Sequence, residues 1–144
     1  MKKIFMKLLI LFLIVFIPST TKADQYMLSC KIKVAAVTMD TNEIMREYVI
    51  DRYFIVDTVL EGVFDANNEP LQVNSFTQSE ITFSKRASSF ADIVDTRMTY
   101  NRSSHKITLN EIYAYASKFD QRARFITKGE GNCIETKIDR KPLF

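Results

Sequence analysis

Hydrophobic and polar residues alternate between positions 26 and 36 of the chain. Ser29, Lys31 and Lys33 lie between members of an apolar set made up of Tyr26, Leu28, Cys30, Ile32, Val34 and Ala36. A period of two is typical of a β-strand with one buried face. The pattern therefore predicts a half-buried strand with Cys30 on its core side.

Short apolar stretches divided by polar turns follow along the chain. Residues 47–59 are rich in β-branched and aromatic side chains and predict a second strand, with residues 62–64 as its shorter continuation. The turn formers at 65–70 predict a hairpin connection into Leu71 and Val73. Later strands are expected at 81–85, 90–95 and 107–109, with turns at 77–80, 88–89 and 101–106.

The segment from 110 to 120 fits two structures. Ile112 and Phe119 fall at helical spacing after Asn110, which is a favourable helix cap, whereas Tyr113 and Tyr115 alternate with alanines as in a strand. We expect a strand, with a short helix near 110–120 as the alternative.

The end of the chain holds two of the three glycines. Residues 122–127 and 132–138 are expected to be strands joined by a tight turn at 128–131, which would bring Cys133 to its partner. Gly129-Glu130-Gly131 lacks the further glycine, the lysine and the helix of a nucleotide-binding loop.

These elements together predict an all-β fold. About eight mostly antiparallel strands, separated by short polar turns, would form a curled sheet or a small β-barrel. No internal repeat or linker interrupts the chain, so residues 24–144 are expected to form one domain.

Residues 1–23 have the composition of a signal peptide. Lys2, Lys3 and Lys7 precede an apolar run at 8–17, and Thr21-Lys22-Ala23 places small residues where signal peptidase cleaves. A membrane anchor would need about twenty apolar residues, and a lipid-modified cysteine should follow the apolar run directly, whereas Cys30 does not. The sequence predicts export to the periplasm or the medium, without a stable membrane span after cleavage.

Cleavage changes the charge of the protein. The whole chain has 20 basic and 17 acidic residues, a net charge of +3. Removing residues 1–23 takes away four lysines and no acid, which leaves a net charge of −1. The basic excess therefore belongs to the leader, and no nucleic-acid partner is expected.

Export also bears on the two cysteines. An oxidising compartment favours a disulfide between Cys30 and Cys133. The alternative is two separate buried thiols.

No catalytic constellation is visible in the sequence. His105 is the only histidine and falls in an expected turn, so neither a histidine pair for a metal nor a His-based triad is indicated. A hydrolase could use a pair of carboxylates, and Asp92 with Asp95 or Glu43 with Glu47 are candidates for such a pair. They are candidates only because acidic residues are numerous in this chain. We expect no enzyme activity, no cofactor and no metal.

Two further motifs have a structural and a functional interpretation. Asn101-Arg102-Ser103 matches a glycosylation acceptor, which matters only in a eukaryotic source. Tyr113, Tyr115 and Phe119 could line a ligand cavity, or simply fill the core of a small β-protein without tryptophan. The second interpretation is preferred.

Two families resemble this sequence. Asn101-Arg102-Ser103-Ser104, residues 107–109, Gly131-Asn132-Cys133 and the end at Lys141 and Phe144 resemble small exported proteins of Gram-negative bacteria that have no assigned function. That resemblance covers residues 81–144 and implies an exported β-domain without an activity. Cys30 and Cys133 also resemble the cysteine plan of the periplasmic C-type lysozyme inhibitors, although the Ser-Gly-x-x-Tyr type of inhibitory loop is absent.

The function expected from the sequence is binding. We expect a non-catalytic exported β-domain that binds a protein or an envelope component. The alternatives are a lipocalin-like carrier of a small ligand, a lysozyme-inhibitor-like protein and, last, a carboxylate-based hydrolase.

Overall fold

The computed structural model describes residues 24–39, 41–88, 92–115 and 123–138. These form eight strands and no helix: β1 (Gln25–Thr38), β2 (Ile44–Asp57), β3 (Gly62–Asp65), β4 (Gln72–Phe76), β5 (Glu80–Ser88), β6 (Asp92–Asn101), β7 (Lys106–Tyr115) and β8 (Ala123–Lys137). The predicted all-β fold is confirmed. Within the described ranges no helix is long and apolar enough to cross a membrane. The expected signal peptide at 1–23 lies outside them and stays a prediction.

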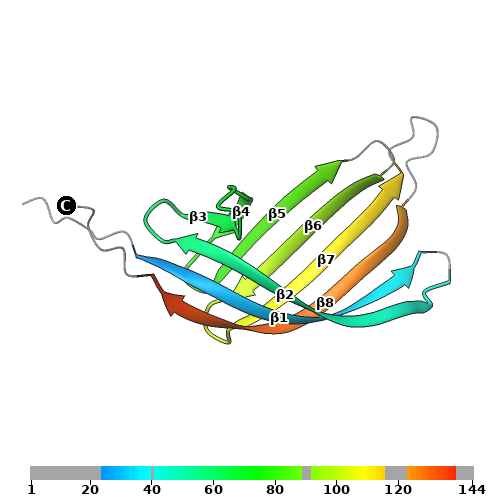
Figure 1. Ribbon diagram of the computed structural model, residues 1–144, viewed down its shortest axis with the longest axis horizontal. Coiled ribbons are helices and arrows are strands. Elements are labelled where there is room, and N and C mark those ends of the chain that lie inside the picture. Colours follow the sequence, from blue (N-terminus) through cyan, green and yellow to red (C-terminus); the bar gives the residue numbers. More distant parts are fainter. Residues whose placement is uncertain (1–23, 40, 89–91, 116–122, 139–144) are drawn as a thin grey trace, which may run out of the picture.

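One antiparallel sheet contains all eight strands, in the order β3-β2-β1-β8-β7-β6-β5-β4. The sheet curls until its two edge strands meet, where Phe64 and Pro70 form an isolated bridge and the Leu71 N–H donates to the Val63 carbonyl at 2.8 Å. Figure 1 shows β3 and β4 close together at one end of the molecule. The protein is therefore a nearly closed β-barrel.

The core fills the end of the barrel that β3 and β4 close. The expected alternation in β1 is confirmed, because Lys31 and Lys33 are exposed while the even-numbered residues between Leu28 and Val34 are buried. The rings of Phe54 and Phe83 meet edge to face at 5.0 Å between centroids. The buried hydrophobic residues are Leu28, Cys30, Ile32, Val34, Phe54, Val56, Val63, Leu71, Ile81, Phe83, Met98, Tyr100, Ile107, Leu109 and Cys133.

Cys30 and Cys133 form a disulfide, as predicted. The two residues lie directly opposite each other in β1 and β8, with their Cα atoms 4.0 Å apart. Both side chains are buried on the inner face of the barrel. The bond therefore joins the strands from the two ends of the domain.

The predicted turn at 128–131 is wrong. Lys128, Gly129, Glu130 and Gly131 lie inside β8, which continues without a break and pairs with β1 on one side and β7 on the other. No described glycine has a positive φ. Gly129 and Gly131 are instead places where β1 approaches too closely for a side chain on β8.

The structure corrects the expectation for residues 62–64 and bears out those for residues 65–70 and 110–115. Residues 62–64 do not continue the second strand, because β3 turns back and pairs with residues 54–57 of β2. The expected hairpin connection at 65–70 is confirmed as a turn that the antiparallel bridge between Phe64 and Pro70 closes. The strand expected after Asn110 is confirmed as far as Tyr115, where β7 ends, so the alternative of a helix is wrong there. Residues 116–122 are not described.

Candidate functional site

The barrel is open along one side. β2 pairs with β3 only through residues 54–57, and β5 pairs with β4 only through residues 81–84. The remaining parts, residues 44–53 of β2 and 85–88 of β5, have no second neighbouring strand among the described residues. We call these two stretches, which diverge in Figure 1, the open seam.

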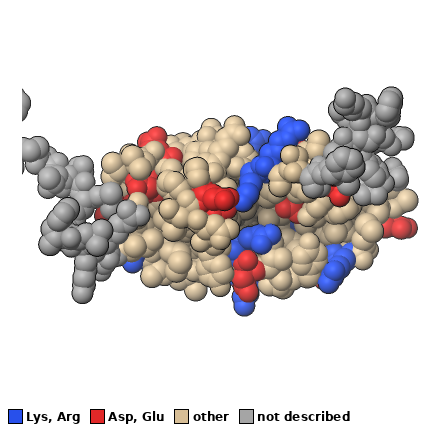
Figure 2. All heavy atoms as spheres, turned by 45° about the horizontal axis from the view of Figure 1, so that its top comes forward, with Lys and Arg blue, Asp and Glu red and all other residues tan. Residues whose placement is uncertain are grey.

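A cleft of about 340 Å³ opens beside this seam. Phe54, Leu71 and Met98 of the core border it, and Arg52 and Lys85 lie among its charged residues. Figure 2 shows basic and acidic side chains next to one another around a hollow in the middle of one face. The volume is at the lower end of the range for small-molecule sites.

An ion pair closes one side of the cleft. Lys85 Nζ lies 2.8 Å from Asp65 Oδ2 and 3.8 Å from a Glu69 carboxylate oxygen. The hydrogen bond from Lys85, followed by that from the Glu69 backbone N–H, lowers the pKa of Asp65, and the same contact with Asp65 raises the pKa of Lys85. Asp65 Oδ1 also accepts bonds from the Asn67 and Glu69 N–H groups. This pair ties β5 to the turn between β3 and β4.

Glu111 is engaged by two hydroxyl groups. Thr96 Oγ1 donates to Glu111 Oε2 at 2.8 Å, and the Tyr113 hydroxyl donates to Oε1 at 2.6 Å. Burial, and next the hydrogen bond to Glu111, raise the pKa of Tyr113 well above its ordinary value. The Tyr113 ring stacks on Phe125 at 4.2 Å between centroids. The Glu111 carboxylate is thus held in place on the inner face of the barrel as an acceptor of two hydrogen bonds.

Arg52 differs from Lys85 and Asp65, which also line the cleft. Within the described part of the chain, no carboxylate forms an ion pair with Arg52, whereas Lys85 and Asp65 pair with each other. Arg46, six residues away on the same strand, has its guanidinium 5.3 Å from the centre of the Tyr48 ring. The seam therefore presents positive charge on the inner face of β2.

Exposed apolar side chains gather on the open part of β2. Ile44, Met45, Val49 and Tyr53 are each at least half exposed, at 61, 63, 58 and 50%. An unpaired strand edge that also exposes large apolar groups is unusual in a protein without a partner, because it promotes edge-to-edge association. This stretch is the strongest indication of a binding surface.

A broader hollow of about 720 Å³ lies on the outer face of the barrel. Its lining includes Lys33, Arg97, Lys128 and Glu130, together with the backbone at Gly129. Charges of both signs are mixed there, and Lys33 already lies 3.9 Å from Glu47. The hollow shows no group that favours one kind of ligand.

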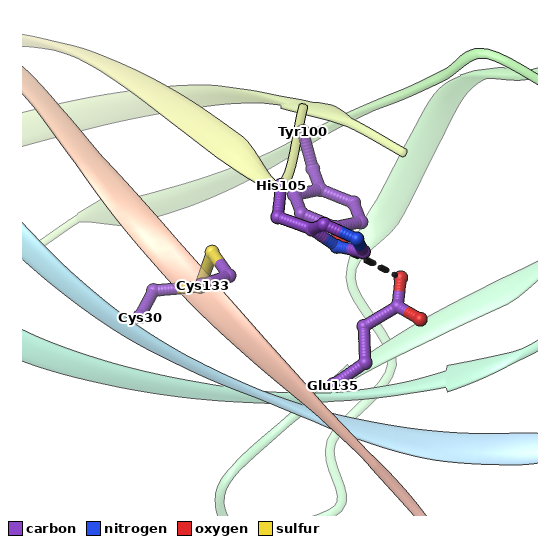
Figure 3. Close-up of a disulfide and its surroundings, with 5 residues drawn as sticks. All are labelled: Cys30, Tyr100, His105, Cys133 and Glu135. Atoms are coloured by element: carbon purple, nitrogen blue, oxygen red, sulfur yellow. Dashed lines mark hydrogen bonds and ion pairs between the residues drawn. A yellow bond between two sulfur atoms is a disulfide. The ribbon is translucent and has the colours of Figure 1, made fainter. Parts of the chain in front are cut away.

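A second polar cluster lies at the closed end of the barrel, near the disulfide. Tyr100 is fully buried, and its hydroxyl donates to Glu135 Oε1 at 2.6 Å. The Tyr100 hydroxyl oxygen also lies 2.8 Å from His105 Nδ1, so it accepts a bond from a protonated Nδ1. Figure 3 shows the three side chains converging from β6, β8 and the turn between β6 and β7. His105, which the sequence placed in a turn, thus joins a cluster that includes a residue 30 positions away.

This cluster predicts alkaline destabilisation. Burial, and next the hydrogen bond to Glu135, raise the pKa of Tyr100 above the usual value of 10.0. Above that pH the unfolded chain loses a proton that folded Tyr100 keeps, so the free energy of unfolding should fall as pH rises. One such tyrosine contributes a slope of up to about 1.4 kcal/mol per pH unit.

Urea unfolding between pH 8 and 11.5 measures that slope. Tyr100→Phe should make the slope shallower, while Tyr53→Phe, on the exposed part of β2, should leave it as in the wild type. Equal slopes in all three proteins would contradict the assignment to Tyr100.

The acidic pairs suggested by the sequence are not brought together for catalysis. Asp92 and Asp95 are three residues apart in the regular strand β6, so they point to opposite faces, and Asp95 lies 3.6 Å from Arg86. Glu43 precedes β2 and Glu47 is on its outer face, next to Lys33. No group of three or more His, Cys, Asp or Glu residues in the described ranges could hold a metal ion.

The other two motifs have structural contacts. Asn101 Oδ1 accepts bonds from the Ser103 and Ser104 N–H groups, so this side chain shapes the turn after β6. Of the proposed aromatic cluster, Tyr113 is on the inner wall, the side chain of Tyr115 is not described and Phe119 lies outside the described residues.

The charged residues of the cleft were not predicted, although the sequence contains a signal for them. Lys85 follows Ile81 and Phe83 at a spacing of two, and Glu111 follows Ile107 and Leu109 in the same way. A charged residue in phase with a buried apolar set must point inward. Extending the alternation beyond the last apolar residue would have found both.

The family resemblances of the sequence stay predictions. Comparisons of the chain with protein-family models, with curated proteins and with solved structures find no match. The barrel and its open seam therefore carry the functional argument.

Proposed function

We propose that this protein is an exported, non-catalytic β-barrel domain that binds a protein or an envelope component along its open seam. One observation carries the proposal: residues 44–53 of β2 combine exposed apolar side chains with a strand edge that no described strand covers. Such a surface supplies both backbone hydrogen-bonding groups and apolar area to a partner.

The cysteines support the proposed compartment. The described part of the chain contains a disulfide and no free cysteine. Structural disulfides persist in the periplasm and outside the cell, where thiols are not kept reduced. This agrees with the leader-like composition of residues 1–23.

Carriage of a small ligand is the second candidate function. The cleft of about 340 Å³ and the cation of Arg52 favour it. The opposite end of the barrel is filled by side chains, so a ligand would have to occupy the open part alone. A lipocalin-like carrier would therefore hold a small ligand with a polar or anionic group.

Photo-crosslinking in the cells that produce the protein tests the leading proposal. A benzoylphenylalanine placed at Val49 should give a discrete adduct after irradiation, because that side chain would lie within the interface. The same residue at Thr108, exposed on the outer face of β7, should give none.

Absence of an adduct from Val49, Met45 and Tyr53 would contradict binding along the seam. Equal adducts from Val49 and Thr108 would indicate non-specific contact. A small molecule retained by the purified domain in native mass spectrometry, without a protein adduct, would favour carriage instead.

A further inference from the structure

The free edge of β2 indicates how a partner would bind. We infer that the partner is a protein that adds one extended segment to this edge, and that the segment carries the inverse of the β2 charge pattern. This inference rests on the proposed function, because it specifies the chemistry of the partner at the same seam.

The geometry of the edge suits strand addition. Ten consecutive residues, 44–53, are in strand conformation, and β1 is their only pairing partner among the described residues. Backbone N–H and C=O groups on the other side are available to a further strand. Partner segments that use such edges gain affinity from main-chain hydrogen bonds and specificity from alternate side chains.

The charges on this edge form a palindrome centred on Val49. Reading from residue 46 to 52, the order is a base, an acid, three apolar or aromatic residues, an acid and a base. The register with β1 is unbroken over this stretch, so Arg46 and Arg52 point to the inner face while Glu47 and Asp51 point to the outer face. Each face therefore has charges of one sign.

This palindrome disfavours pairing with a second copy of the chain. In the antiparallel pairing centred on Val49, Arg46 of one copy would lie opposite Arg52 of the other, and Glu47 opposite Asp51. In a parallel, in-register pairing each charge would lie opposite itself. Like charges directly opposite each other on neighbouring strands are destabilising.

The complementary segment has the order acid, base, three uncharged residues, base, acid. Because the β2 pattern is symmetric about Val49, this order matches it in either strand direction. Acids would meet Arg46 and Arg52 on the inner face, and bases would meet Glu47 and Asp51 on the outer face. Lys33 already forms an ion pair with Glu47, with 3.9 Å between Nζ and Oε2. Because both side chains are exposed, this pair competes only weakly with a base of the partner.

Fluorescence anisotropy with two labelled peptides tests the inference. The matching probe contains Glu-Lys-Val-Thr-Val-Lys-Glu, and the inverted probe has the same composition in the order Lys-Glu-Val-Thr-Val-Glu-Lys. The matching probe should bind on the order of tenfold more tightly than the inverted probe. Its four cross-strand charge pairs with β2 are attractive, whereas the same four pairs are repulsive with the inverted probe. Alternate N-methylation of the matching probe should abolish binding.

A charge-swapped protein provides the matched control. The variant Arg46→Glu, Glu47→Lys, Asp51→Lys, Arg52→Glu keeps the net charge and changes exposed positions only. Its NMR spectrum should retain the dispersion of the wild type, and it should prefer the inverted probe. Chemical-shift changes on adding the matching probe to the wild type should be largest in residues 44–53.

Four results would overturn the inference. Equal binding of both probes, no binding of either, or shift changes outside β2 would each contradict a charge-selected added strand. A concentration-dependent dimer joined through β2 would identify a second copy as the occupant. If the Val49 crosslink forms but neither probe discriminates, the proposed function stands and this inference fails; if no crosslink forms, the proposed function itself fails.

Discussion

Replacing Cys30 and Cys133 together by alanine should lower the free energy of unfolding by about 4–5 kcal/mol. The two cysteines are 103 residues apart, and the chain-entropy model assigns about 4.7 kcal/mol to a cross-link that closes a loop of roughly 100 residues. Domains of this size are stable by about 5–15 kcal/mol. The disulfide therefore accounts for about a third or more of the stability of the domain.

The sheet topology explains why this one bond matters so much. Every strand pair of the sheet other than β1–β8 joins strands that are consecutive in sequence, so each of these pairs can form locally. The β1–β8 pairing alone joins the first strand to the last, and it unites β1–β3 with β4–β8. Without the disulfide, folding must bring these ends together against the full loop entropy.

Equilibrium urea unfolding of the oxidised wild type and the double variant measures the difference. Val34→Ala is the matched control, since Val34 is buried on the same face of β1 and its truncation removes packing without opening a cross-link. The double variant should lose clearly more stability than this control. A loss no larger than that of Val34→Ala would show that the bridge contributes only packing.

The fold class could be predicted because most of its information is local. The alternation in β1 identified the buried face and the orientation of Cys30, and the polar residues at 101–106 marked the turn between β6 and β7. Such patterns reflect the two-residue period of a strand and the backbone needs of a turn. They do not depend on how the sheet closes.

The turn before β3 was missed because its own residues give a weak signal. Thr58, Val59, Leu60 and Glu61 contain no glycine, proline or asparagine. The turn is set from outside by buried Asp57, whose Oδ1 accepts the N–H groups of Val59 and Leu60 at 3.0 and 2.9 Å. An aspartate directly after an apolar strand favours a turn, and Asp57 was the residue that could have indicated this one.

The polar clusters could not be predicted from spacing alone. Tyr100 and Glu135 are 35 residues apart, and their hydrogen bond depends on β7 placing β6 and β8 on either side of it. The same holds for Lys85 and Asp65, which meet only because the two edge strands close the barrel. Contacts of this kind require the strand order, which no local pattern contains.

The glycines of β8 lead to the second large prediction. Gly131→Ala should lower the free energy of unfolding by about 3 kcal/mol, at the upper end of the usual cost of overpacking. A Cβ at Gly131 would collide with the Lys31 carbonyl oxygen and would lie 2.7 Å from Ile32 Cα. Both obstacles are backbone atoms of β1, which cannot move without disturbing the pairing of β1 with β8.

Gly129→Ala is the control that separates the two kinds of obstacle. There a Cβ would meet Val34 Cγ1 at 2.5 Å and Ile32 Cγ2 at 2.8 Å, which are ends of side chains that can shift. Its loss in urea unfolding should therefore be smaller, about 1 kcal/mol. In an unobstructed strand the same substitution stabilises, because glycine has more backbone entropy to lose than alanine. A stabilising Gly131→Ala would therefore contradict the close approach of β1 to β8 at this position.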